Sequence, residues 1–163
     1  MAAALHSFPD PGHDHRACFD GGLDAAVRIC GANGLRLTRD RRHVFEVLLR
    51  EHMAIGAYDI IERIDWGGRK RASSVVYRAL DFLAASGLVH KLHSRHAFIA
   101  CTHPGADHGA QFLICAQCEA VAEIADRAVE RVVVGAARKA GFLVRRPVIE
   151  IDGLCPHCAD AHA

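Results

Sequence analysis

The chain carries two pairs of cysteines that could together hold a metal ion. Each pair has two residues between its members, and we call such a pair a hook: Cys115-Ala116-Gln117-Cys118 and Cys155-Pro156-His157-Cys158. Zinc prefers sulfur and nitrogen ligands in a closed tetrahedral shell of four, so the two hooks predict a structural zinc site. The 36 residues between the hooks exceed the span of a small zinc ribbon. The metal would therefore tie the start of a subdomain to its end.

Paired cysteines also serve redox chemistry, disulfide frameworks and zinc deaminases. An oxidoreductase motif needs a following helix that lowers the thiolate pKa, and only residues 159–163 follow the second hook. A deaminase needs H-x-E before P-C-x-x-C, but the chain lacks H-x-E and its Pro156 lies inside the hook. We therefore expect no enzyme, with a thiol–disulfide oxidoreductase as the less favoured alternative.

A second set of possible ligands is spread over the middle of the chain. Sulfur, two imidazoles and a carboxylate would form a mixed tetrahedral shell that zinc accepts. The set consists of His90, Cys101, His108 and Glu123. No local spacing requires this combination, and His93, His96 and His103 are nearby competitors for the same role.

Composition places the chain among globular proteins that work in a reducing compartment. Of 163 residues, 51% are hydrophobic and the formal net charge is +1, which argues against disorder. No apolar run reaches the ~20 residues of a membrane span. The first residues show no secretory signal, so we expect a cytoplasmic protein whose seven cysteines bind metal more readily than they form disulfides. The twelve histidines indicate either a local bias or a second metal site.

Charge is divided unevenly between the two halves of the chain. Residues 28–95 hold 13 Lys and Arg against 7 Asp and Glu, whereas residues 102–163 hold 6 against 8. Three of the basic residues, Arg69, Lys70 and Arg71, are consecutive. A basic first half indicates contact with a polyanion such as DNA.

Apolar periodicity predicts four helices in the first half of the chain. They are expected at about 23–30, at 38–52 with Thr38 as the N-cap, at 57–65, and from Ser73 or Ser74 to Gly87. Two strand-like runs follow at 88–92 and 97–101. Three helices and a hairpin in this order are typical of a winged helix, a helix-turn-helix variant that binds DNA.

The fourth helix has the features of a recognition helix. Its apolar stripe leaves Arg78 pointing away from the core, with Ser74 one turn before it. An arginine in that position can reach the O6 and N7 acceptors of guanine in the major groove. A merely solvated arginine is the alternative interpretation.

The rest of the chain predicts a small second domain, and the fold class is α+β. Residues 1–20 are expected to be a flexible tail. Weak metal binding by His6, His13, His15 and Cys18 is the alternative interpretation of this segment. Residues 21–101 then form the winged helix and the turn-rich residues 102–111 a hinge. Residues 112–163 form the second domain. Strands are predicted at 111–115, 120–124 and 142–151 and a helix at 125–140, so that the first strand begins at the last residue of the hinge. So small a core would need zinc to help stabilise it.

Several segments in order resemble the ferric uptake regulator superfamily, and most closely its zinc-sensing branch. They are Arg36-Leu37-Thr38, Ala57-Tyr58-Asp59, residues 75–83 (VVYRALDFL), Gly87-Leu88-Val89-His90-Lys91 and Phe112-Leu113-Ile114-Cys115. The resemblance covers about residues 22–158. Unlike the family's usual sequence, Glu119 replaces a glycine, Val75 replaces a threonine, and the His-rich run of iron sensors is absent.

The resemblance implies a dimeric repressor that binds operator DNA when it is loaded with metal. It assigns the four hook cysteines to a structural zinc ion, and His90, Cys101, His108 and Glu123 to a regulatory one, which makes two ions per subunit. Tyr58 and Arg78 would read bases, helped by Ser74, Tyr77 and the basic segment 69–71. The alternative is a regulator on the same scaffold that senses iron, manganese, nickel or peroxide.

Overall fold

The computed structural model describes residues 8, 14–51, 53–68, 72–106 and 109–161. The chain divides into two compact units. Asp10–Gly105 forms the first, which we call the helical unit, and Ala106–Ala163 together with Met1–Pro9 forms the second, which we call the C-terminal unit. The division falls inside the segment 102–111 that the sequence predicts as a hinge.

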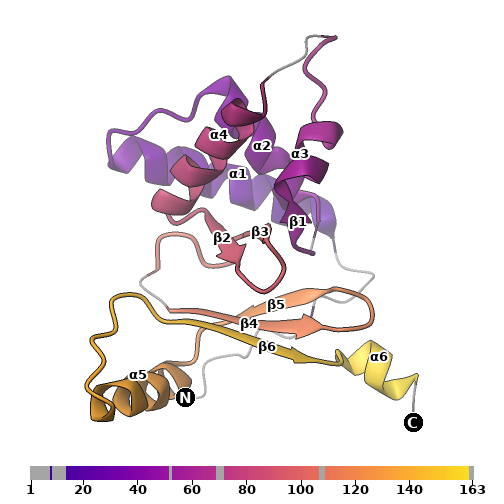
Figure 1. Ribbon diagram of the computed structural model, residues 1–163. Coiled ribbons are helices and arrows are strands. Elements are labelled where there is room, and N and C mark those ends of the chain that lie inside the picture. Colours follow the sequence, from indigo (N-terminus) through magenta and orange to yellow (C-terminus); the bar gives the residue numbers. More distant parts are fainter. Residues whose placement is uncertain (1–7, 9–13, 52, 69–71, 107–108, 162–163) are drawn as a thin grey trace. The chain divides into compact units, whose positions relative to one another are not determined.

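The helical unit combines four helices with a small antiparallel sheet (Figure 1). The strands lie in the order β1-β3-β2. β1 was not predicted, because two residues are too few to show a period. The elements are α1 (His15–Ala32), α2 (Arg39–Leu49), β1 (Ile55–Gly56), α3 (Ala57–Arg63), α4 (Ser73–Ala85), β2 (Val89–Leu92) and β3 (Ala97–Ala100).

The core of the helical unit is formed by the apolar stripes of its helices. Phe45 and Leu48 of α2 and Leu80 and Leu83 of α4 are at most 1% exposed, and Ile60 of α3 is fully buried. Residues of this kind at a spacing of three and four fall on one helix face, so each helix has one side to bury. As predicted, Thr38 caps α2, its Oγ1 accepting a hydrogen bond from the Arg41 amide at 3.5 Å.

Two predictions for the helical unit are wrong. Residues 15–20 are not a flexible tail, since α1 begins at His15 and its Phe19 packs against the core. Asp14 explains this start, because its Oδ1 accepts a hydrogen bond from the Arg16 amide at 2.9 Å. Neither predicted serine caps α4, because Ala72 holds the N-cap position and the serines already lie in the first turn. His6 and His13 lie outside the described residues.

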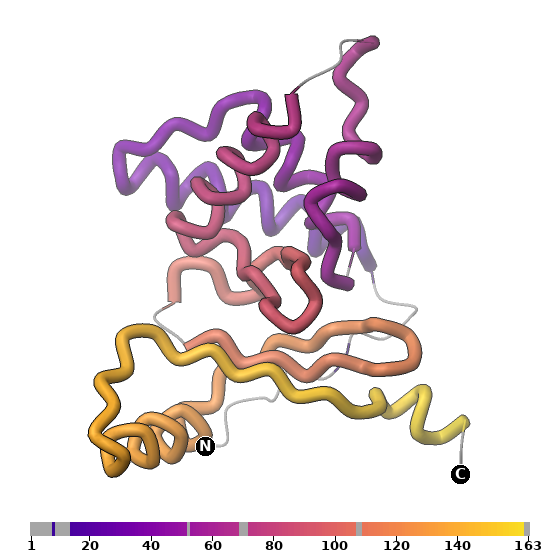
Figure 2. The backbone as a smooth tube through the Cα atoms, viewed as in Figure 1, coloured from indigo at the N-terminus to yellow at the C-terminus, as the bar shows by residue number. Residues whose placement is uncertain are grey.

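The C-terminal unit is a three-stranded sheet with two helices (Figure 2). The strands lie in the order β5-β4-β6, with β5 antiparallel and β6 parallel to the central β4. Its elements are β4 (Ala110–Cys115), β5 (Val121–Ile124), α5 (Arg127–Lys139), β6 (Val148–Gly153) and α6 (Pro156–Asp160).

The parallel pairing of β4 with β6 needs a crossover, and α5 provides it. Asp126 caps this helix through a hydrogen bond from the Ala128 amide to its Oδ1, at 2.6 Å. The fold is therefore α+β, as predicted. Among the described residues, no helix is long and apolar enough to cross a membrane.

Candidate metal sites and nucleic-acid interface

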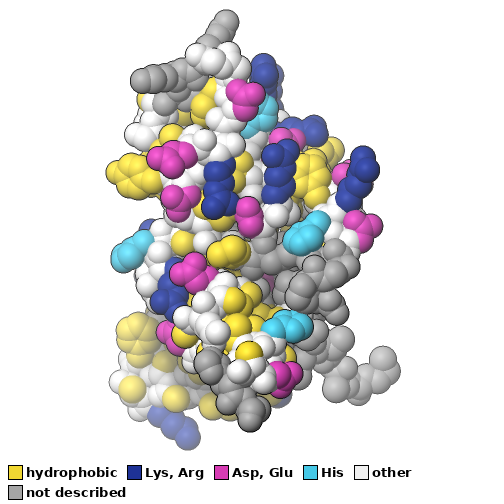
Figure 3. All heavy atoms as spheres, turned by 90° about the vertical axis from the view of Figure 1, so that its right-hand side faces the viewer, with side chains coloured by type: hydrophobic (Ala, Val, Ile, Leu, Met, Phe, Trp, Pro, Cys, Tyr) yellow, Lys and Arg dark blue, Asp and Glu magenta, His cyan; other side chains and the backbone are white. Residues whose placement is uncertain are grey.

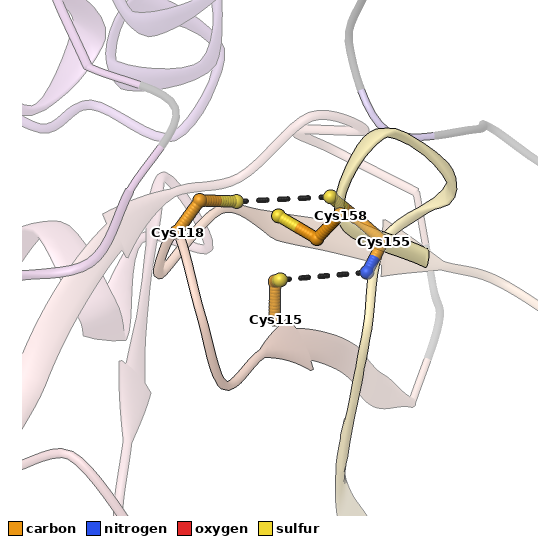
Figure 4. A group of neighbouring side chains, drawn as sticks. All are labelled: Cys115, Cys118, Cys155 and Cys158. Carbon is orange, nitrogen blue, oxygen red and sulfur yellow. Dashed lines mark hydrogen bonds between the residues drawn. The ribbon is translucent and has the colours of Figure 1, made fainter. Parts of the chain in front are cut away.

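The four hook cysteines converge at one end of the C-terminal sheet (Figure 4). Their sulfur atoms all lie within 4.8 Å of one another, and we call this group the clasp. The parallel register of the strands brings the hooks together, because Cys115 at the end of β4 lies opposite Gly153 at the end of β6. Cys155 follows as the N-cap of α6, with Cys158 one turn later.

The clasp has the dimensions of a zinc–thiolate site. With Zn–S bonds of about 2.3 Å, the edge of a tetrahedron measures about 3.8 Å. The sulfur atoms of Cys118 and Cys155 lie 3.7 Å apart, and all seven cysteines of the chain are free. That separation suits two ligands of one ion and excludes a disulfide between these two sulfur atoms.

Hydrogen bonding and burial act in opposite directions on the thiols of the clasp. Backbone N–H groups of Cys118 and Cys155 lower the pKa of Cys115 to about 6, and the Cys155 amide lies 3.4 Å from its sulfur. Burial raises the pKa of Cys158 to about 12. The protein's own groups thus favour one thiolate, whereas the charge of a divalent cation would favour all four.

The residue that directly follows the first hook has a strained backbone. Glu119 has a φ of +61° and donates its amide hydrogen to the Cys115 carbonyl at 3.0 Å. A left-handed conformation costs a residue with a Cβ atom about 1 kcal/mol or more and suits glycine better. The family that the sequence resembles usually has glycine at this position, and the left-handed backbone explains why.

The second hook lies in a helix that the sequence analysis did not predict. α6 begins at Pro156, and proline at the first helical position is favoured because it has no amide hydrogen that needs a partner. A five-residue helix therefore does accompany the second hook, although residues 159–163 were expected to be too few to form one. The case against an oxidoreductase rests instead on the clasp itself, where Cys155 lies among three other cysteines.

The helical unit brings two ligands of the second predicted metal set together. His90 lies on β2 and is 6% exposed, and Cys101 directly follows β3 and is 7% exposed. His90 pairs with Ile99, so Cys101, two residues further on, lies on the same face of the sheet. The ligand atoms of His90 and Cys101 lie within 4.8 Å of each other.

The two remaining members of that set belong to the C-terminal unit. Glu123 lies on β5 and is only 3% exposed, which is unusual for a carboxylate. His108 lies outside the described residues. Of the competitors, His93 and His96 are exposed in the turn between β2 and β3, and the Nδ1 of His103 lies 2.9 Å from the Oγ1 of Thr102.

The residues predicted to contact DNA share the surface of the helical unit. On α4, Ser74, Tyr77 and Arg78 are exposed, and the Arg78 Nε donates a hydrogen bond to the Ser74 carbonyl at 3.2 Å. Tyr58 on α3 is 73% exposed. Over the helical unit, Figure 3 shows basic side chains interspersed with acidic ones. Arg69, Lys70 and Arg71 lie outside the described residues.

Sequence reasoning missed one contact of the clasp. Phe8 packs against Cys115, Cys155 and Cys158, although it stands more than one hundred positions before them. Its only signal in the sequence is that no other Phe, Tyr or Trp occurs before Phe19, and that signal does not name a partner.

Comparisons with known proteins agree with one another. Residues 32–151 match the model of the Ferric uptake regulator family. The zinc uptake regulation protein of Escherichia coli K12 is 35% identical over 142 residues, covering 86% of this chain and 83% of that protein.

Two solved structures are similar over most of their length. A zinc uptake regulator complexed with zinc and DNA has a TM-score of 0.81 and 34% identity, covering 88% of this chain and 97% of the other. The structure of holo XcZur has a TM-score of 0.78 and 39% identity, and the match covers 86% of this chain and 99% of that chain.

Replacing one cysteine of the clasp should remove one zinc ion. We expect Cys155→Ser to bind one zinc ion per chain fewer than the unmodified protein and to lower the unfolding temperature of the C-terminal unit, because a structural zinc contributes directly to folding. Elemental analysis and thermal unfolding would measure both. Cys18→Ser, on the exposed part of α1, is the matched control and should change neither. Equal zinc content in the two variants would contradict the assignment.

Proposed function

Because the chain belongs to the ferric uptake regulator family, we propose that it is a zinc-responsive transcriptional repressor of zinc uptake genes. It binds operator DNA as a metal-loaded homodimer in the cytoplasm, and it has no catalytic role. The E. coli relative carries the name of zinc uptake regulation, and one similar structure contains both zinc and DNA. The observation that carries the proposal is the presence, in one chain, of the clasp and of the buried pair His90 and Cys101.

Each subunit is proposed to hold two zinc ions with different roles. The clasp supplies four sulfur ligands to a structural ion. The regulatory ion would use His90, Cys101, His108 and Glu123. A thiolate among its ligands favours zinc over manganese or iron, which suit carboxylate and imidazole sets. When bound, this ion would neutralise the negative charges of the Cys101 thiolate and the Glu123 carboxylate, and it would link its four ligands to one another.

The regulatory site is proposed to control DNA binding by linkage. His90 and Cys101 belong to the helical unit and Glu123 to the C-terminal unit. An ion held by all of them would restrict the orientation of the winged helix, selecting the spacing that fits two half-sites. Zinc that favours the DNA-competent state must then tighten operator binding by the same factor as DNA tightens zinc binding.

The DNA contacts are proposed to divide into base reading and phosphate binding. α4 would enter the major groove, with Arg78 donating to guanine and Tyr58 of α3 contacting a neighbouring base. Lys91 on β2 is exposed and would contact the phosphate backbone from the wing.

The homodimer is proposed to form through the C-terminal unit. α5 has no buried residue in the single chain, although its sequence is strongly amphipathic. Val132 on α5 is 71% exposed and Val133 is 42% exposed, while Phe142 and Leu143 after the helix are 66% and 80% exposed. An apolar surface of this extent is typical of a protein–protein interface.

Removing a regulatory ligand should abolish the effect of zinc without unfolding the protein. We expect Cys101→Ser and His90→Ala to bind operator DNA equally weakly with and without zinc, while remaining dimeric. Gel shifts across a series of zinc, iron, manganese and nickel concentrations would measure this and identify the metal. His93→Ala, in the exposed turn of the wing, is the control and should respond to zinc normally. A normal zinc response in Cys101→Ser would contradict the proposed site.

Two substitutions should separate base reading from phosphate binding. Arg78→Ala should cost about 1–3 kcal/mol of operator binding and relax the preference at one base position. Lys91→Ala should weaken binding to all sequences alike and reduce the salt slope by about 1. Competition binding with operator variants at several salt concentrations distinguishes the two. Similar losses on operator and random DNA for both variants would show that Arg78 reads no base.

A charge on α5 should dissociate the dimer. We expect Val132→Asp to sediment as a monomer, because the carboxylate would be desolvated in the interface. Val27→Asp is the matched control, since Val27 is 58% exposed on α1 of the helical unit, and it should remain dimeric. If Val132→Asp stayed dimeric at micromolar concentration, the interface would lie elsewhere.

A further inference from the structure

The side chain of Phe8 rests on the clasp. It is partly buried and packs against the buried cluster of Cys115, Cys155 and Cys158, as Ala120 also does. Phe8 belongs to the same compact unit as these cysteines, although the whole of the helical unit lies between them in the sequence. Aromatic side chains that pack against cysteines can make favourable contacts with their sulfur atoms, so this residue has a defined place on the C-terminal unit.

The next element of the chain belongs to the other unit. α1 begins at His15 in the helical unit, and only residues 9–14 separate it from Phe8. Six residues span at most about 20 Å even when fully extended. With Phe8 held on the clasp, the helical unit is connected to the C-terminal unit at both ends of its sequence, through residues 9–14 and through the segment that leads to β4.

We propose that Phe8 is an anchor that docks onto the metal-filled clasp, giving the winged helix a second attachment to the dimerisation unit. This inference rests on the proposed function and deepens it. The clasp then has a role beyond folding its own unit, because it also provides the surface against which Phe8 is held.

The anchor depends on the metal because the docking surface is made of metal ligands. An ion bound by all four cysteines closes their shell and fixes the sulfur positions against which the ring packs. Without it, only the pairing of β4 with β6 and hydrogen bonds such as that from the Cys155 amide to the Cys115 sulfur hold the two hooks together. Phe8 is then expected to leave the surface when the clasp is emptied.

A second attachment reduces the freedom of the winged helix before DNA is bound. Closing a chain at two points excludes orientations that a single link would allow. Less conformational entropy is then lost when two winged helices bind one operator. Loss of the attachment should therefore raise the operator dissociation constant. The energy of a sulfur–aromatic contact sets the scale of this increase at about 2- to 10-fold.

Docking can be measured directly with cobalt in the clasp. The full-length protein would carry 4-fluorophenylalanine at its seven phenylalanine positions and Cys101→Ser, so that the clasp is the metal site that is filled. The Phe8 signal is the one missing from the spectrum of Phe8→Leu. We expect paramagnetic Co²⁺ in place of Zn²⁺ to shift or broaden this signal strongly. An unchanged Phe8 signal would overturn the proposal.

Operator binding at saturating zinc tests the consequence of docking. We expect Phe8→Ala to weaken binding about 2- to 10-fold, and Phe8→Leu, which keeps an apolar side chain, to weaken it less. Both variants should keep the same zinc content and remain dimeric. Wild-type operator affinity in Phe8→Ala would overturn the attachment role.

The two measurements also separate this inference from the proposed function. If the unmodified protein failed to bind operator DNA with zinc, the proposed function would fail, while the cobalt experiment would still decide whether Phe8 docks. If operator binding responded to zinc but the Phe8 signal ignored cobalt, the anchor alone would be wrong.

Discussion

The structure depends first on the meeting of four cysteine sulfur atoms at the end of the C-terminal sheet. A three-stranded sheet with a crossover helix that buries no residue of its own has a small core, and units of this size commonly need a metal for stability. The clasp joins the end of β4 to the residues after β6, so it fixes the two strands whose pairing defines the unit. β5 pairs with β4 and carries Glu123. The clasp therefore supports a proposed ligand of the regulatory ion without responding to the regulator's signal.

The responsive chemistry is proposed to lie in a different kind of site. The clasp has four chemically similar ligands drawn from one unit, which suits an ion that is bound once as the protein folds. The proposed regulatory set is mixed and drawn from both units, so its occupancy can be linked to an equilibrium between conformations of the chain. The thiolate of Cys101 would give that proposed set its preference for zinc. The proposed permanent and responsive sites thus differ in whether their ligands belong to one unit of the chain or to both.

Much of the fold could be predicted from periodicity and spacing, and the failures have physical reasons. The stripes of α2 and α4 were predicted because Phe45, Leu48, Leu80 and Leu83 repeat at helical intervals. The hooks were recognised because ligand spacing is local. The start of α1 was missed because Pro9, Pro11, Gly12, Gly21 and Gly22 suggested a mobile tail. The cap at Asp14 and the packing of Phe19 outweigh the low helix propensity of the two glycines that lie within α1. Phe8 was missed because long-range contacts leave no periodic signal. The spacing of His90, Cys101, His108 and Glu123 did not by itself identify them as ligands of one ion. Only the resemblance to a family selected this set.

The central claim is that zinc and operator DNA bind the same conformation. The most direct test measures the affinity of the regulatory zinc ion in the presence and absence of saturating operator DNA, by competition with a chelator of known affinity. Reciprocity requires operator DNA to tighten zinc binding by the same factor by which zinc tightens operator binding. We expect two equal factors, both well above one. A zinc affinity that operator DNA leaves unchanged would contradict it.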